Sequence, residues 1–148
     1  KAAHFGITLN ASSQNNCILM NCFAVRLLPQ TDLKKEIFDF FKSKNISAGV
    51  ILSSVGSLKQ AHLRFSDQKT GTMLTGPFEI LSLNGTLSLD GVHLHLCISD
   101  HKGQTYGGHL LDNCLIHTTC ELVIAEIPGH TFTRELDPQT KYMELKIK

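Results

Sequence analysis

The sequence VHLHLCI at positions 92–98 alternates apolar and polar side chains without interruption. Successive side chains of a β-strand point to opposite faces of the sheet. This stretch is therefore expected to form a strand with its aliphatic side chains on one face and His93, His95 and Cys97 on the other. Two histidines thus share one face of a single predicted strand.

The residues that follow predict a hairpin that brings a third histidine to the same face. The sequence SDHKG at positions 99–103 contains Asp and Gly, which are common in tight turns. If the loop comprises residues 101–103, His95 lies opposite His109, and the two preceding glycines remove side chains that would crowd it. Opposed residues have Cβ atoms about 5 Å apart on one face. His93, His95 and His109 are therefore predicted to cluster.

Three neutral imidazoles suit Zn²⁺ and other borderline divalent transition-metal ions. A three-histidine site also leaves a fourth position for water or substrate, as in catalytic zinc sites. The pattern leaves a second interpretation open, in which the histidines lie on an exposed polar face and bind nothing. His93, His95 and His109 are the candidate metal ligands, with Zn²⁺ the expected ion.

A rival spacing of metal-binding residue types is Cys114-x-x-His117-x-x-Cys120. It lacks a second Cys-x-x-Cys half, and an extended chain would place these side chains on both faces of a sheet. Buried cysteines that act as small hydrophobic residues are the favoured interpretation. The remaining histidines singled out are expected at the surface or in loops: His62, His101 and His130.

The rest of the chain predicts one helix and many strands. Residues 1–16 are polar and aperiodic and are expected to form a flexible leader, ahead of a single domain over residues 17–148. Asp32 precedes apolar residues at helical spacing, which predicts a helix over residues 32–44. Short apolar or alternating runs predict strands over residues 17–28, 48–55, 61–65, 78–89 (with a bulge at Gly85), 92–99, 120–127, 131–136 and 142–147. The fold class is α+β, a mostly antiparallel sheet with one main helix.

The charge balance argues against several classes of binding protein. Fourteen Lys and Arg against thirteen Asp and Glu leave a formal charge of +1, whereas a broad face for DNA or anionic membranes needs many cations. No apolar run approaches the roughly 18 residues of a transmembrane helix. Five cysteines without disulfide-scaffold spacing favour reduced thiols and an intracellular location, cytoplasmic or nuclear.

The order of short motifs over residues 26–126 resembles the PPC domain, the plant and prokaryote conserved domain that plant nuclear proteins carry behind AT-hook motifs. The most specific match is GPFEILSLNG at positions 76–85. It is preceded by RL at 26–27 and GSL at 56–58. It is followed by HLHL at 93–96, SD at 99–100, GGHL at 107–110 and TTCE at 118–121.

The resemblance implies an α/β fold with a mostly antiparallel sheet and assembly as a homotrimer. It is closest to the bacterial and archaeal branch, in which the His-x-His and Gly-Gly-His positions are metal ligands, and so implies that role for His93, His95 and His109. Plant members generally lack these histidines. Their DNA affinity is attributed largely to an Arg-Gly-Arg-Pro core that this sequence does not contain. The resemblance therefore favours contacts with partners over direct groove binding.

Two functions follow from the sequence. One is a metal-binding homotrimer that acts as a DNA-associated or regulatory interaction module, with itself, DNA or DNA-associated proteins as partners. The other is a hydrolase-like enzyme whose three-histidine metal activates water. Such an enzyme needs a general base, for which Glu79 and Asp100 are the candidates. In the alternative, Glu79 is a strand residue paired with a cation and Asp100 stabilises a turn.

Overall fold

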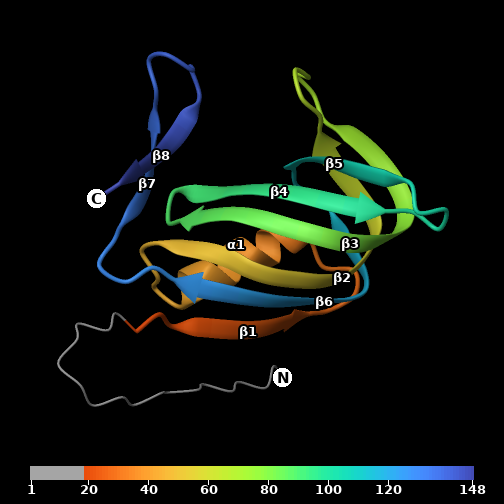
Figure 1. Ribbon diagram of the computed structural model, residues 1–148, viewed down its shortest axis with the longest axis horizontal. Helices are drawn as coiled ribbons and strands as arrows, with labels where there is room; N and C mark the ends of the chain where they lie inside the picture. Colours follow the sequence, from red (N-terminus) through yellow and green to blue (C-terminus); the bar gives the residue numbers. More distant parts are fainter. Residues whose placement is uncertain (1–18) are drawn as a thin grey trace.

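A computed structural model describes residues 19–148 (Figure 1). In chain order its elements are β1 (Cys22–Leu27), α1 (Leu33–Ser43), β2 (Gly49–Arg64), β3 (Thr72–Ser88), β4 (Gly91–Ser99), β5 (Thr105–Leu110), β6 (Leu115–Glu126), β7 (Phe132–Leu136) and β8 (Met143–Ile147). The expected α+β class, a mostly antiparallel sheet with one helix, is confirmed for this part of the chain. The expected leader at residues 1–16 lies outside the described residues.

The main sheet curls until two distant strands meet. Within residues 19–148 its six strands run in the order β1-β6-β2-β3-β4-β5, and each neighbouring pair is antiparallel. β5 also pairs with the end of β2, where Leu63 lies opposite Leu110 and Arg64 lies opposite His109. Both leucines are fully buried. The curl therefore packs the core on its inner side and places Arg64 next to a histidine of β5.

Helix α1 covers one face of the sheet and lies behind it in Figure 1. Asp32 caps its N-terminus, because the side chain accepts a 2.9 Å hydrogen bond from the Lys35 backbone N–H. Leu33, Ile37 and Phe41 lie on one side of the helix and are fully buried. The predicted helix is therefore confirmed. No helix in the described part of the chain is long and apolar enough to cross a membrane.

β7 and β8 form a separate hairpin, the C-terminal hairpin, beside the turn that joins β3 to β4 (Figure 1). The Phe132 N–H donates to the Ser47 carbonyl oxygen at 2.9 Å. The Arg134 N–H donates to Asp90 Oδ2 at 3.1 Å, and Arg134 Nη2 donates to Thr86 Oγ1 at 2.6 Å. These hydrogen bonds attach the C-terminal hairpin to the end of the sheet that carries His93.

The structure corrects the expected break in the first half of the sheet. Residues 48–55 and 61–65 are not separate strands but parts of β2, which continues through Gly56. A Cβ at Gly56 would lie 2.2 Å from the Thr119 carbonyl oxygen. Gly56 thus permits the close approach of a neighbouring strand and does not end its own.

Other strand boundaries also differ from expectation. β3 begins at Thr72, six residues before the predicted start at 78, and its register shift lies between Ile80 and Ser82. The bulge expected at Gly85 is therefore wrong, since Gly85 pairs in register with Leu94. β6 begins five residues earlier than the predicted strand at 120–127, and β1 is shorter than the predicted 17–28. Single-sequence patterns leave strand ends poorly determined because exposed ladder residues carry no apolar signal.

Candidate metal centre

The predicted hairpin brings the three histidines together. β4 and β5 pair with His95 opposite His109 and Ser99 opposite Thr105, the register that a three-residue loop predicts. The ring centroids are 5.2 Å apart for His93 and His95, 5.0 Å for His93 and His109, and 5.7 Å for His95 and His109. Each ring offers one nitrogen, and these atoms all lie within 4.8 Å of one another. The predicted histidine cluster is present.

The geometry and chemistry of the histidine cluster fit a divalent cation. His93 Nε2 and His95 Nε2 are 3.3 Å apart. Two nitrogens bound at about 2.0–2.1 Å to a tetrahedral zinc ion also lie about 3.3 Å apart. His109 Nδ1 is buried and has no hydrogen-bond partner among the described residues. An unsatisfied buried nitrogen is costly, so this ring has an atom available to a further bonding partner.

Two glycines allow the backbones around the histidine cluster to approach closely. A Cβ at Gly85 would lie 1.9 Å from the His93 carbonyl oxygen, and one at Gly108 would lie 2.8 Å from the Arg64 carbonyl oxygen. Gly85 therefore permits β3 to lie close beside His93, and Gly108 permits β5 to approach β2. The glycine before His109 thus relieves a backbone contact, whereas the sequence suggested relief of side-chain crowding.

Burial lowers the pKa of two imidazoles of the histidine cluster, His93 and His109. It is the main reason that the pKa of His109 falls from 6.5 to about 4, with smaller contributions from His93 and Arg64. The pKa of His93 is also lowered, first by burial and then by Arg134 and His95. Neutral imidazole is the form that binds a metal. At neutral pH these two rings are therefore in the metal-binding state.

The low pKa of His109 should make the metal-free protein less stable in acid. The unfolded chain takes up this proton near pH 6.5, whereas the folded chain does so only near pH 4. The unfolded state binds more protons between these two pH values. The part of the free energy of unfolding that depends on His109 is therefore fully present above pH 6.5 and is lost as the pH falls towards 4. Urea unfolding of EDTA-treated protein across this range measures the loss. His109→Gln should flatten the profile and His101→Gln, in an exposed turn, should not; the opposite pattern contradicts the assignment.

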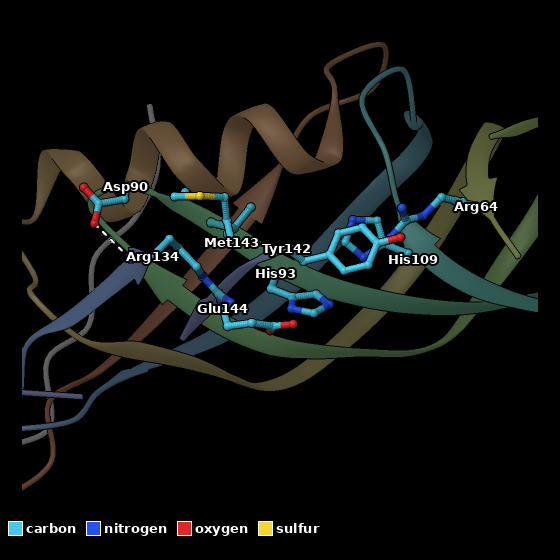
Figure 2. A pocket seen from close by; sticks show the side chains of 10 residues that line it. Arg64, Asp90, His93, His109, Arg134, Tyr142, Met143 and Glu144 are labelled. Carbon is cyan, nitrogen blue, oxygen red and sulfur yellow. Dashed lines mark hydrogen bonds between the residues drawn. The ribbon is translucent and has the colours of Figure 1, made fainter. Parts of the chain in front are cut away.

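Two cavities adjoin the histidine cluster. The first has a volume of about 470 Å³ and is lined by His93, His109 and residues of the C-terminal hairpin (Figure 2). The second has a volume of about 810 Å³ and is lined by His95, His109 and both glycines that precede His109. Arg64 and Tyr142 line both cavities. The histidines therefore face space large enough for water or a small ligand, not packed protein.

The two carboxylates proposed as general bases lie away from the histidine cluster. Glu79 is exposed near the middle of β3, roughly 23 Å along that strand from the residue that pairs with His93. Asp100 accepts hydrogen bonds from the backbone N–H groups of Lys102 at 2.8 Å and Gln104 at 2.9 Å. Desolvation acts to raise the pKa of Asp100, but these two hydrogen bonds bring it below its usual value. Neither carboxylate lines either cavity beside the histidines.

Three charged residues that line the first cavity were not predicted from the sequence. Arg134 and Glu144 belong to the C-terminal hairpin, and Asp90 belongs to the turn between β3 and β4. Nothing in their spacing links them to the histidines, because distant segments meet only in the folded chain. Among the charged residues that line the cavity, only Arg64 has a position that the sequence pattern indicates. It alternates with Leu63 in a predicted strand, which places its side chain on the polar face.

The structure separates the members of the rival cluster. Cys114 and Cys120 are fully buried, and burial raises the pKa of each thiol to about 12. Both therefore stay protonated and pack as small hydrophobic residues, as predicted. His117 is exposed, so it does not share a site with them.

The other histidines join no metal-binding group among residues 19–148. His101 and His130 are exposed and lie outside strands, as expected. His62 differs from expectation, since it is half-buried within β2 and its Nδ1 lies 2.9 Å from the Asp112 carbonyl oxygen.

These features define an α+β domain in which a His-x-His strand faces a Gly-Gly-His strand across an antiparallel hairpin. The sequence model of the Plants and Prokaryotes Conserved (PCC) domain matches residues 15–128. The chain belongs to this family, which confirms the resemblance to the PPC domain. The matched residues end before β7, so the C-terminal hairpin lies beyond them.

Several known proteins are similar to this chain. A bifunctional protein GlmU from Synechococcus sp. (strain JA-2-3B'a(2-13)) is 47% identical over 129 residues, which are 87% of this chain but 20% of that relative. The chain therefore spans about a fifth of the curated relatives it matches.

Solved structures share the fold. A hypothetical protein from Salmonella cholerae-suis is 41% identical, with a TM-score of 0.85 over 90% of this chain and 96% of its own. The metal-containing protein AF0104 from Archaeoglobus fulgidus is 30% identical, with a TM-score of 0.75. The match covers 85% of this chain and 93% of that protein. A candidate DNA-binding protein from Ralstonia eutropha JMP134 is 20% identical, with a TM-score of 0.76. The match covers 85% of this chain and 91% of that protein, and at this identity it shows a similar fold only.

Proposed function

We propose that this PCC domain holds a divalent transition-metal ion on His93, His95 and His109, and that the ion is Zn²⁺. The observation that carries the proposal is the convergence of three ring nitrogens within 4.8 Å. The unpartnered His109 Nδ1 and the metal-containing relative from A. fulgidus support it. Elemental analysis of protein purified without added metal should find about one ion per chain. A chain that stays metal-free even after incubation with Zn²⁺ contradicts the proposal.

A cation held by His93, His95 and His109 would supply a Lewis acid that water or a ligand could reach. The chain's own residues determine what reaches that position. β4 and β5 hold the rings in register, and the two cavities beside them admit a small molecule. These features support an interaction module with an accessible metal centre, in preference to a sealed structural zinc site.

We also propose that the domain assembles as a homotrimer, as the family resemblance implies. The sheet face opposite α1 has a hollow lined in part by Ala24, Val55 and Val123, and Val55 is 53% exposed. Apolar surface of this kind is typical of subunit contacts. In analytical ultracentrifugation Val55→Asp should therefore sediment as a monomer. Leu136→Asp, at an exposed apolar position in β7, should remain a trimer; a monomeric unmodified chain contradicts the proposal.

We propose that association with DNA runs through partner proteins and not through a basic face of this domain. The structural likeness to a candidate DNA-binding protein motivates the question, but the formal charge is only +1. A gel-shift titration with duplex DNA at low salt should show no complex. A complex whose affinity falls steeply as the salt concentration rises reveals direct phosphate contacts and contradicts this view.

Metal-dependent hydrolysis is a second candidate function, favoured by the cavities that the histidines face. Among the carboxylates considered, Glu144 lines the first cavity and is better placed than Glu79 or Asp100 to accept a proton from water. Assays of the metal-loaded chain against simple esters, amides and phosphate esters test this function. If the Glu144→Gln variant hydrolyses these substrates as fast as the wild type, Glu144 is not the general base.

A further inference from the structure

Two guanidinium groups without carboxylate partners lie beside the histidine cluster. Arg64 in β2 lies opposite His109 in β5, so their Cβ atoms are about 5 Å apart on one face. Arg134 lines the same cavity as His93 (Figure 2). The ion pairs among residues 19–148 involve neither arginine. A concave site whose arginines form no direct ion pair is suited to binding an oxyanion.

Neutral contacts hold both guanidinium groups in place. Arg134 Nη2 donates to Thr86 Oγ1 at 2.6 Å, and Thr86 is the β3 partner of His93. Arg64 Cζ lies 6.0 Å from the ring centroid of Tyr142, which reaches over the cavity from the segment before β8 (Figure 2). One hydrogen bond and one ring contact leave most of the five N–H donors of each group for a ligand.

The charges of the first cavity favour an anion once a cation is bound. Asp90 and Glu144 also line the cavity, but Asp90 Oδ2 accepts from the Arg134 backbone N–H and Glu144 Oε1 accepts from Thr140 Oγ1. The formal charges of the two arginines and the two carboxylates therefore sum to zero. A divalent cation on three uncharged imidazoles makes the same cavity positive, so anion binding should depend on the metal.

We propose that the first cavity binds a small organic anion, a carboxylate or phosphate ester whose oxyanion group lies between the histidine cluster and Arg64. Its apolar part would pack on Val92, Tyr142 and Met143, which line the cavity. The volume of about 470 Å³ suits a ligand of this size. The inference rests on the proposed metal centre. It assigns the C-terminal hairpin, which lies beyond the residues matched to the family, the role of selecting the ligand.

Binding to the Co²⁺-loaded full chain tests the proposal, because the visible d–d absorption of Co²⁺ reports on its surroundings. The probes are isobutyrate, its neutral isostere isobutyramide, and inorganic phosphate. Isobutyrate or phosphate should change the spectrum saturably, the amide should not, and comparison of the two anions distinguishes a carboxylate from a phosphate ligand. Arg64→Gln should weaken the anion about tenfold or more. Arg26→Gln, which removes an arginine of β1 whose Nε donates to Thr119 Oγ1 away from the cavity, should not.

Metal content measured on the same samples separates this proposal from the metal proposal. A wild-type chain that binds no metal overturns both. A chain that binds metal but has equal anion affinity in wild type and Arg64→Gln, or equal affinity for the acid and the amide, overturns the anion site alone. If Arg64→Gln lowers the metal content, Arg134→Gln replaces it, since Arg134 takes no part in the β2–β5 pairing. Unchanged anion affinity in that variant then overturns the proposal.

Discussion

Replacing both His93 and His95 with alanine should abolish metal binding and leave the fold intact. The Nε2 atoms of these residues are 3.3 Å apart, and their loss leaves one imidazole of the histidine cluster, too few ligands to hold an ion at micromolar concentration. The buried face of β4, formed by Leu94, Leu96 and Ile98, is unchanged. Elemental analysis should fall from about one ion per chain to near zero, while the circular dichroism spectrum of the metal-free chains stays the same.

The matched control removes two histidines from outside the histidine cluster. His101 and His130 are exposed and lie outside strands, so His101→Ala/His130→Ala should keep the wild-type metal content. Equal metal content in the two double variants would end the three-histidine proposal. If the His93→Ala/His95→Ala chain does not fold, His95→Gln, which keeps a polar side chain at an exposed position, still decides the question through its metal affinity.

The histidine cluster could be predicted from sequence because it depends on local register. Strict alternation over residues 92–98 places His93 and His95 on one face, and a tight turn then fixes which residue of the next strand lies opposite. The Asp100 side chain stabilises the turn, since it accepts hydrogen bonds from the backbone N–H groups of Lys102 and Gln104. Short-range turn chemistry thus determines where His109 lies.

The walls of the site could not be predicted, because they depend on contacts between distant segments. Arg64 reaches the histidine cluster only because the sheet curls until β2 meets β5, and this curl is set by packing of the whole core. Arg134 comes from β7 and Tyr142 from the segment just before β8, and both strands are short and partly exposed. The break expected between residues 55 and 61 is wrong for a similar reason: the close approach that requires Gly56 involves a strand more than sixty residues away in sequence.

Gly85→Ala should destabilise the sheet and weaken metal binding together. A Cβ at this position would lie 1.9 Å from the His93 carbonyl oxygen, well inside any nonbonded contact. Gly85 pairs with Leu94, the residue between the two histidines of β4, so β3 and β4 must separate at the centre of the site. We expect a loss of about 2–4 kcal/mol in the free energy of unfolding, measured by urea denaturation of the metal-free chain, and a rise of about tenfold or more in the metal dissociation constant.

Gly91→Ala is the control that distinguishes the steric effect of a Cβ at Gly85 from the effect of its backbone conformation. Gly91 has a φ of 146°, almost the same as the 149° of Gly85, but a Cβ there would meet nothing within 4 Å. Gly91→Ala therefore carries the backbone penalty alone, about 1 kcal/mol, and should leave metal affinity unchanged. A larger effect at Gly85 means that the missing side chain sets the β3–β4 spacing on which the positions of His93 and His95 depend. Equal losses in the two variants mean that backbone conformation alone explains both glycines, and that the approach of β3 does not position the metal ligands.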